Sequence, residues 1–509
     1  MLSNIKSIYL NGLKGYTVYV QVDVSAGIPE FNIVGLPDVS IKESKERVSV
    51  AIKNSGYEFE SRKIVVNLAP ADIRKEGSSM DLAISIGILI STKQLKTKKD
   101  LSKIAFVGEL SLDGSMNSVK GILPICIEAK KIGFDEIIIP KINEKEVSIV
   151  DGINIKGASN LKEVTDYLNG EYELSEYKET WSDIIKNERM YSIDFSDVKG
   201  QEKAKRALEI AAAGGHNCLL IGSPGTGKTM LAQRLITILP DLSYDESLEI
   251  TKIYSVSGLL DEKNPIITKR PFRTPHHSIT QTSLIGGGRI PKPGEISLSN
   301  YGVLFLDEFT EFNKHIIEVL RAPIEDGKIT ISRVNSSITY PSKFMLVASM
   351  NPCPCGYYGS EVKECKCTEK MIKKYLSKIS GPLLDRIDIQ VEVPQVKYEK
   401  INEKNIETSA QIKQRVNEAR KIQIARYKED HIYCNDSLTP KLMKKYCSLD
   451  DTSNKILEKA FDNLKLSMRA YGRIIKVART IADLEQSKEI KSKHIAEAIQ
   501  YRVLDKNYF

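Results

Sequence analysis

Short apolar runs alternate with segments of helical periodicity along the first part of the chain, residues 1–168. This mixture predicts an α+β domain. The runs with the pattern of strands are Tyr16–Val24, Lys63–Leu68 and Ile104–Val107, and the segments with the pattern of helices are Met80–Ile90 and Ile122–Ile132. A stretch rich in Glu, Lys and Tyr follows at 169–193 and is typical of a linker.

From residue 194 to 395 the apolar runs become short and wholly hydrophobic, with helical segments between them. This alternation is typical of a parallel sheet covered by helices on both faces. Strands are predicted at Cys218–Ile221, Val303–Leu306 and Phe344–Ala348, and a helix at Met230–Leu239. Residues 396–509 have helical periodicity only, and therefore predict a helical domain. Its helices are expected at Ile406–Tyr427, Ser453–Leu464, Ala470–Leu484 and Ser492–Leu504.

Composition narrows the class of protein without identifying it. The chain has 509 residues, of which 41% are hydrophobic and 28% charged, as in ordinary globular proteins. No stretch approaches the roughly 20 apolar residues that span a bilayer, and the N-terminus lacks the order of a signal peptide. We therefore expect a cytoplasmic protein without a membrane partner. The net charge of +8 permits a polyanionic partner but does not identify one.

The segment 222–229 reads GSPGTGKT and matches the phosphate-loop pattern without a mismatch. It lies between a predicted buried strand and a helix, where backbone N–H groups and the helix N-terminus attract phosphate. Lys228 is expected to reach the β- and γ-phosphates, and the Thr229 hydroxyl to bind Mg²⁺. The segment predicts ATP and Mg²⁺ as cofactors. The predicted nucleotide-binding residues are Gly222, Ser223, Pro224, Gly225, Thr226, Gly227, Lys228 and Thr229.

Acidic and polar residues follow the other predicted strands. Asp307 and Glu308 end an apolar run, where Asp307 would bind Mg²⁺ and Glu308 would orient and deprotonate the attacking water. Asn351 follows the next strand and is a candidate contact to the γ-phosphate, or simply a turn residue before a proline. Arg386 is a candidate for the cation that a neighbouring subunit supplies, or an ordinary surface arginine.

Four of the eight cysteines lie within fifteen residues, as C-x-C, nine residues, then C-x-C. They are Cys353, Cys355, Cys365 and Cys367. Four thiolates in a reducing compartment suit a tetrahedral structural Zn²⁺, and leave no open position for a catalytic one. Because C-x-C is a less common zinc spacing than C-x₂-C, free or disulfide-forming thiols and an iron–sulfur cluster remain as alternatives.

Longer runs resemble the magnesium chelatase-like AAA+ proteins, and within them the ComM (YifB) competence family. The runs that carry the resemblance are 194–201 (DFSDVKGQ), 206–217 (RALEIAAAGGHN), 270–277 (RPFRTPHH), 286–288 (GGG) and 293–298 (PGEISL). The resemblance extends over essentially the whole chain. It implies an AAA+ phosphate-loop core with a helical lid, a homohexameric ring, and a DNA helicase that drives branch migration on single-stranded or branched DNA.

The resemblance also assigns roles to single residues. Asn351 matches the first sensor, Arg386 the arginine finger and Arg469 the second sensor in the lid. Two insertions of this AAA+ branch match 278–298 and the alternating segment 327–340. In related ring helicases such hairpins project into the pore. The candidate phosphate contacts are Arg289, Lys292 and Arg333, and solvated hairpin charges are the alternative. Adjacent His276 and His277 do not share a face, which disfavours a paired metal site and favours a structural role.

The N-terminal domain resembles Lon-type proteases as well as the chelatase subunit. The segment 75–82 (KEGSSMDL) is similar to the region around the Lon serine nucleophile, and 106–114 to the strand and turn that follow it. Lon chemistry needs a lysine base, but Leu123 occupies that position, and Lys120 and Lys130 are off register. The resemblance therefore predicts a Lon-like, ribosomal-protein-like α+β fold without protease activity, used for assembly or DNA contact.

These features support one leading function and two alternatives. The leading hypothesis is a hexameric ATP-dependent DNA translocase that promotes branch migration in recombination or natural transformation. A chelatase-type ATPase motor that inserts a metal ion into a tetrapyrrole with partner subunits is the second. A scaffold that binds nucleotide without hydrolysing it is the third, and the full set of catalytic residues argues against it.

Overall fold

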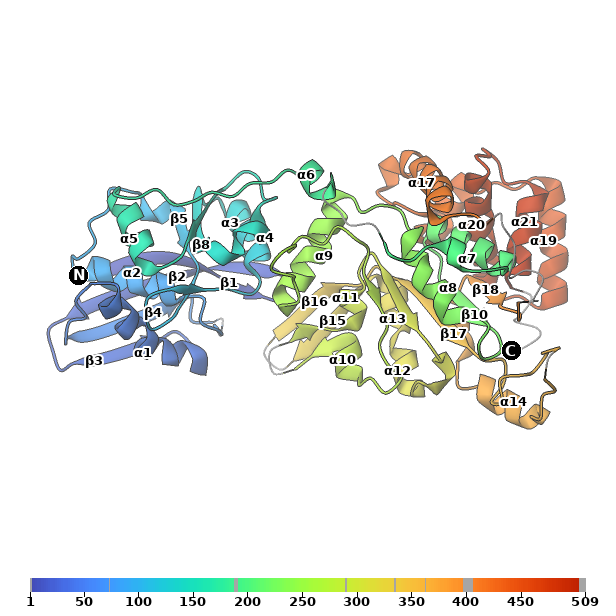
Figure 1. Ribbon diagram of the computed structural model, residues 1–509, viewed down its shortest axis with the longest axis horizontal. Helices are drawn as coiled ribbons and strands as arrows, with labels where there is room; N and C mark the ends of the chain where they lie inside the picture. Colours follow the sequence, from blue (N-terminus) through green and yellow to red (C-terminus); the bar gives the residue numbers. More distant parts are fainter. Residues whose placement is uncertain are drawn as a thin grey trace. The chain divides into compact units, whose positions relative to one another are not determined.

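The computed structural model describes residues 2–72, 74–186, 191–288, 291–333, 336–361, 363–396 and 406–502. The chain divides into two compact units (Figure 1). Unit 1 comprises Met1–Glu188 together with Tyr244–Thr268, and unit 2 comprises Arg189–Ser243 together with Lys269–Phe509. The predicted nucleotide-binding region, apart from Tyr244–Thr268, and the predicted helical region therefore belong to one unit.

A mixed sheet of seven strands organises the described part of unit 1, in the order β3-β4-β2-β1-β5-β8-β9. A long hairpin of β1 and β2 lies at its centre, with Ile5 opposite Val20, and both side chains are buried. The strands are β1 Leu2–Asn11, β2 Lys14–Ser25, β3 Glu30–Val34, β4 Lys63–Ala69, β5 Ile104–Phe106, β8 Glu136–Pro140 and β9 Asn154–Ala158, with β6 Glu109–Leu110 and β7 Met116–Asn117 as a separate small pair.

The helix α2 packs on this sheet and has an almost uninterrupted apolar surface. Nearly every side chain of α2 is buried, because Leu, Ile and Ala occupy successive positions around the helix. The helices are α1 Val39–Asn54, α2 Asp81–Ser91, α3 Ile122–Ile132, α4 Glu144–Val147, α5 Leu161–Asn169 and α6 Trp181–Lys186. This α+β arrangement confirms the predicted class of the N-terminal region, and α6 lies within the segment predicted as a linker.

A further helix of unit 1, α9 (Tyr244–Ser257), comes from the middle of the segment expected to form the nucleotide-binding core. It packs against α3 instead. Gly121 at the start of α3 donates its N–H to the Ser255 carbonyl (3.2 Å), and the Tyr244 hydroxyl donates to the Ile149 carbonyl (2.8 Å). The Ser255 hydroxyl also donates to the buried Glu146 carboxyl (2.5 Å), whose pKa is raised by burial.

Unit 2 is built on a parallel sheet whose described strands have the order β11-β14-β17-β10-β18. Every residue of β10, β14 and β17 is buried, as the wholly apolar runs predicted. The strands are β10 Cys218–Ile221, β11 Phe272–Arg273, β14 Val303–Leu306, β17 Met345–Met350 and β18 Ile389–Glu392. The parallel α/β core is thus confirmed.

The helices of the C-terminal region share a hydrophobic core with this sheet. Val416 of α17 and Ile481 of α20 belong to the same buried cluster as Leu220 of β10. The helices of unit 2 are α7 Glu202–Gly214, α8 Lys228–Arg234, α10 Gln281–Ile285, α11 Glu295–Leu298, α12 Lys314–Val319, α13 Arg321–Asp326, α14 Glu369–Leu376, α15 Gly381–Leu384, α17 Ser409–Arg426, α18 Pro440–Tyr446, α19 Asp451–Leu464, α20 Met468–Leu484 and α21 Ser492–Gln500.

The described part of unit 2 also contains two short hairpins. They are β12 Gly286–Gly287 with β13 Lys292–Pro293, and β15 Lys328–Arg333 with β16 Ser336–Pro341. The first lies within the predicted insertion 278–298, and the second coincides with the predicted insertion 327–340 to within a residue. Among the helices within the described ranges, none is both long and apolar enough to cross a membrane.

Candidate nucleotide site and metal centre

The predicted phosphate loop connects β10 to α8, and its glycines have the conformations that such a loop needs. Gly225 and Gly227 have φ of +78° and +90°, a region that side chains rarely adopt. An added Cβ at either position would meet no atom within 4 Å, so conformation rather than crowding requires these glycines. At Gly222 the reason is different, because a Cβ there would collide with the backbone carbonyl of Val393.

Lys228 lies at the first position of α8 and its ammonium group is held inside the loop. It donates to the carbonyls of Gly222 (2.7 Å) and Ser223 (2.9 Å), and to Oδ1 of Asn351 (3.2 Å). Burial lowers the pKa of Lys228, and the carboxylates of Asp307 and Glu308 partly oppose that effect. The predicted first sensor and the loop lysine are therefore in direct contact.

The carboxylate of Asp307 follows β14 and faces two hydroxyl groups. Thr229 Oγ1 donates to Oδ2 of Asp307 (2.7 Å), and Ser349 donates to Oδ1. Mg²⁺ prefers one or two protein oxygens and several waters, so Thr229 and Asp307 fit this ion. Ser349 was not among the predicted site residues. Its position near the carboxyl end of a buried parallel strand, β17, is the feature of the sequence that could have indicated it.

Glu308 adopts a left-handed backbone conformation, with φ of +52°, and 62% of its side chain is exposed. Its N–H donates to Oδ1 of Asp307 (3.1 Å), so the turn directs the two carboxylates differently. Oε2 of Glu308 lies 3.8 Å from Nδ1 of His277, whose ring stacks on that of His276 with centroids 4.0 Å apart. This contact with the candidate base was not predicted for His277.

The two predicted arginines differ in their surroundings within the chain. Arg386 is only 5% exposed; it pairs with Glu325 (2.6 Å) and donates to the Pro382 carbonyl (2.5 Å). Arg469 is exposed on the first turn of α20. The hydroxyl of Ser467, which caps α20, donates to Oδ1 of Asp385 (3.3 Å) and so connects the start of α20 to the turn before Arg386.

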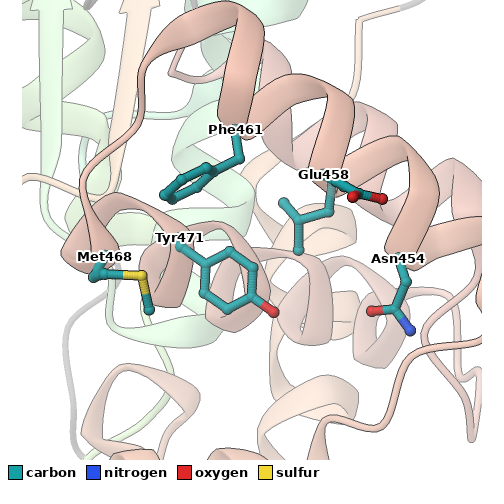
Figure 2. A pocket seen from close by; sticks show the side chains of 6 residues that line it. Asn454, Glu458, Phe461, Met468 and Tyr471 are labelled. Carbon is teal, nitrogen blue, oxygen red and sulfur yellow. The ribbon is translucent and has the colours of Figure 1, made fainter.

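A groove of about 370 Å³ opens beside this end of α20, between α19 and α20. It is lined by Asn454, Leu457, Glu458, Phe461, Met468 and Tyr471. Figure 2 shows the rings of Phe461 and Tyr471 together, with Met468 at one end and Asn454 at the other. The groove is mainly apolar and holds none of the residues predicted to bind nucleotide, so it is a separate feature of the helical region.

The predicted DNA-binding residues lie on the two hairpins. Lys292 is exposed on β13, opposite Gly287. Arg333 ends β15, but its side chain lies outside the described residues, as does all of Arg289. The hairpins touch, because the Tyr340 hydroxyl of β16 donates to the carbonyl of Pro291 (2.9 Å).

The four clustered cysteines converge on one point, as the spacing predicted. Their sulfur atoms all lie within 4.8 Å of one another. Three of the separations are 3.4 Å (Cys353–Cys355), 3.7 Å (Cys353–Cys365) and 3.6 Å (Cys355–Cys365). A tetrahedral ion with bonds of about 2.3 Å requires sulfurs about 3.8 Å apart, so the cluster fits zinc. The N–H of Tyr357 contributes most to lowering the pKa of Cys355 to about 6.

The cysteine loop also packs on the phosphate loop. An added Cβ at Gly356 would lie 2.6 Å from Cδ of Pro224, and 3.9 Å from Cγ of Asn351. Gly356 has φ of +84°, so both its conformation and its neighbours favour glycine. A metal that fixes the cysteine loop would thereby support the phosphate loop.

Purified protein is expected to contain about one zinc ion per chain, which Cys355→Ser should remove. The thermal midpoint of unfolding should fall as well, since metal binding is coupled to local folding. Metal analysis and differential scanning calorimetry measure the two effects. Cys434→Ser, a cysteine outside the cluster, should change neither. Metal-free protein whose four thiols react freely with an alkylating reagent would contradict the zinc assignment.

A second group of possible ligands, His216, Asp388 and Asp436, lies within the same 4.8 Å limit. Arg473 already occupies the space between the two carboxylates, with its NH1 2.7 Å from each. The guanidinium supplies the positive charge that a metal would supply, so this group is an internal ion-pair network.

Comparisons with known proteins match all three predicted regions. The family described as magnesium chelatase, subunit ChlI, matches 194–401; subunit ChlI of Mg-chelatase matches 20–143; and the ChlI C-terminal family matches 406–502. Escherichia coli YifB is 44% identical over 498 residues, and Haemophilus influenzae competence protein ComM is 43% identical over 498 residues. Each alignment covers 97% of this chain and 96% of the relative. The chain belongs to the YifB/ComM family.

The family match defines the type of nucleotide site. The magnesium chelatase-type AAA domain makes this YifB/ComM protein an ATPase that uses ATP with Mg²⁺. The relation to chelatase itself is more distant. The magnesium-chelatase subunit ChlI of Chlorella vulgaris is 28% identical over 183 residues, which is 31% of this chain and 51% of that protein.

The Lon-like signals of the N-terminal region fall on residues that make hydrogen bonds within the domain. Leu123 is buried on α3, and its N–H donates to Oε1 of Glu146 (3.1 Å). Ser78 donates to the carboxylate of Glu109. Lys75 is fully buried and donates to backbone carbonyls, including that of Leu68 (3.0 Å). In the described contacts, Ser78 and Lys75 therefore bond to different partners and not to each other.

Proposed function

We propose that this protein is a homohexameric ATP-dependent DNA translocase that promotes branch migration during recombination or transformation. The observation that carries the proposal is the assembled catalytic set. Lys228 contacts Asn351, Thr229 contacts Asp307, and the largely exposed Glu308 lies two residues after β14, with His277 3.8 Å away. The ComM relative, named as a competence protein, supports the connection to DNA uptake.

Each residue of this set has a distinct task in hydrolysis. Lys228 exchanges its carbonyl partners for phosphate oxygens, and the loop N–H groups bind the same anion. Thr229 and Asp307 would hold Mg²⁺, which would supply positive charge beside the phosphates. Glu308 orients the attacking water and takes its proton. Asn351 contacts Lys228 and positions both this lysine and the attacking water beside the γ-phosphate.

The ring is supported by the place of Arg386 in the sheet. Arg386 precedes β18 and the phosphate loop follows β10, and these strands run parallel with Cys218 opposite Ile389. The two sites are therefore at opposite ends of four-residue strands, about 13 Å apart at ~3.3 Å per residue. Arg386 is thus better placed to act on a neighbour's nucleotide than on its own. Arg469 is close to the same edge in the chain, because Ser467, two residues before it, donates to Asp385, the residue before Arg386.

The first test is steady-state ATPase activity with and without single-stranded and forked DNA. We expect DNA to stimulate turnover severalfold, since the hairpins that carry Lys292 and Arg333 bind phosphates in the pore. Lys292→Ala and Arg333→Ala should each weaken DNA binding and lower its salt slope by about one contact. Lys314→Ala, an exposed lysine on α12, should leave both unchanged.

Hydrolysis that is indifferent to DNA would contradict the translocase and favour the chelatase-type motor. The specific observation behind that alternative is the match of all three regions to ChlI families. Stimulation by a tetrapyrrole-binding partner protein, in place of DNA, would then be the expected result.

A further inference from the structure

Asn217 is a buried polar residue, 3% exposed, that lies directly before β10. Its side chain bridges two other segments of unit 2. The amide oxygen accepts from the N–H of Leu346 on β17 (2.8 Å), and the amide nitrogen donates to the carbonyl of Arg386 (3.2 Å). Since a backbone N–H only donates and a carbonyl only accepts, these partners fix the orientation of the amide.

The backbone of Asn217 binds the same segment a second time. Its N–H donates to Oδ2 of Asp388 (2.9 Å), and its carbonyl accepts from the N–H groups of Asp388 (3.1 Å) and Ile389 (3.0 Å). The backbone of Arg386 is therefore tied to the first residues of β10 and β17. The other ends of these strands carry the phosphate loop and Asn351.

The same segment is also tied to the helical region. Asp388 is buried and accepts from Arg473 of α20 (2.7 Å), and the positive charge of Arg473 holds the pKa of that carboxyl well below its usual range despite burial. Arg473 lies one turn after Arg469, and Ser467 at the start of the helix donates to Asp385. The contacts of Asn217, Asp388–Arg473 and Ser467–Asp385 thus form one hydrogen-bonded frame. It connects the backbone of Arg386 to the helix α20 that carries the exposed Arg469.

We propose that Asn217 is a positioning residue for Arg386, which sets where this arginine meets the nucleotide of the neighbouring subunit. The Asp388–Arg473 ion pair completes the frame and makes the finger follow the movements of α20. The inference rests on the proposed role of Arg386 in the ring. In addition, Asn217 connects the nucleotide site of one subunit to Arg386, the arginine that this subunit supplies to its neighbour.

Asparagine suits this position because it donates and accepts at once. Asn217→Asp keeps the size and the acceptor for Leu346, but replaces the donor to Arg386 with a second acceptor. The variant therefore breaks the finger contact selectively. Asn300→Asp is a matched control, since Asn300 is also buried and its side chain also accepts from a backbone N–H, that of Lys343 (2.8 Å).

The experiment measures ATP binding, ring assembly and hydrolysis for each full-length variant and for equimolar mixtures with Glu308→Gln. Asn217→Asp should bind ATP and assemble as the unmodified protein does, and lose about 100-fold in turnover, the cost of a displaced catalytic group. Mixing with Glu308→Gln should restore about one quarter of full activity, because one interface in four pairs an intact site with an intact finger.

Arg386→Ala mixed with Glu308→Gln provides the benchmark. If that mixture stays inactive, the trans role of Arg386 fails, and the proposal on Asn217 fails with it. If it is active while the Asn217→Asp mixture is not, or if Asn217→Asp alone hydrolyses at a normal rate, the positioning role alone is refuted. Arg473→Gln removes the ion pair with Asp388 and leaves the amide of Asn217 intact. It should lose about tenfold in turnover and be rescued by mixing with Glu308→Gln. If Asn217→Asp does not assemble, this variant tests the frame in its place.

Discussion

Glu308→Gln is expected to abolish ATP turnover, by about 10²–10⁴-fold, while ATP still binds. The amide keeps the shape of the side chain but cannot accept the proton of the attacking water. The phosphate loop, Lys228 and Asp307 are untouched, so the affinity for ATP should stay within a few-fold. Steady-state hydrolysis and equilibrium binding of a fluorescent ATP analogue measure the two quantities separately.

Glu311→Gln is the matched control, because Glu311 is an exposed carboxylate one turn further along the chain and pairs only loosely with Lys378, at 3.6 Å. It should hydrolyse ATP at the normal rate. Normal turnover by Glu308→Gln would remove this residue from the mechanism. The contact between Glu308 and His277 would then be the place to look for another base.

Local motifs explain why so much of the nucleotide site could be predicted from sequence. The phosphate loop is continuous in the chain, and its glycines, lysine and flanking strand and helix are all encoded within about a dozen residues. The cysteine cluster is equally local. Asp307 and Asn351 needed only the rule that parallel strands present their carboxyl ends at one edge of a sheet.

Contacts between distant segments could not be predicted in the same way. The helical pattern of α9 indicates a buried face but not its partner, and α3, against which it packs, lies more than a hundred residues earlier. The expected boundaries therefore placed 244–268 with the core, whereas these residues pack in unit 1. His277 and Glu308 approach each other because β11 and β14 are neighbours, and strand order is not written in either segment.

Asn217 illustrates a signal that was present but not used. A single polar residue directly before a wholly apolar strand must have its hydrogen bonds satisfied inside the protein. The sequence contains that fact, but the partners Leu346 and Arg386 lie 129 and 169 positions away. Only the folded chain brings these three segments together. Their contacts connect the end of the sheet beside Arg386 to the strands that carry the phosphate loop and Asn351 at the other end.

Arg386→Ala should stop hydrolysis in the assembled ring, by about 10³–10⁵-fold, the range for loss of an arginine finger. ATP binding should be largely retained, because the phosphate loop of the same subunit does not depend on Arg386. In the single chain this arginine is paired with Glu325, at 2.6 Å. We expect it to leave that partner when a neighbour's nucleotide supplies more negative charge. The ATPase rate against protein concentration, with ring size from light scattering, measures the effect.

Arg386→Lys separates charge from geometry, since lysine keeps the charge but lacks the planar fork of donors, and it should restore only a small part of the rate. Arg321→Ala serves as the control, because Arg321 also pairs with a glutamate, Glu318 at 3.0 Å, but is more exposed. Turnover of Arg386→Ala that stays normal at concentrations where the ring is complete would exclude a finger at this position. Hydrolysis would then be a property of the single subunit, and the geometry that separates Arg386 from its own phosphate loop would have no catalytic meaning.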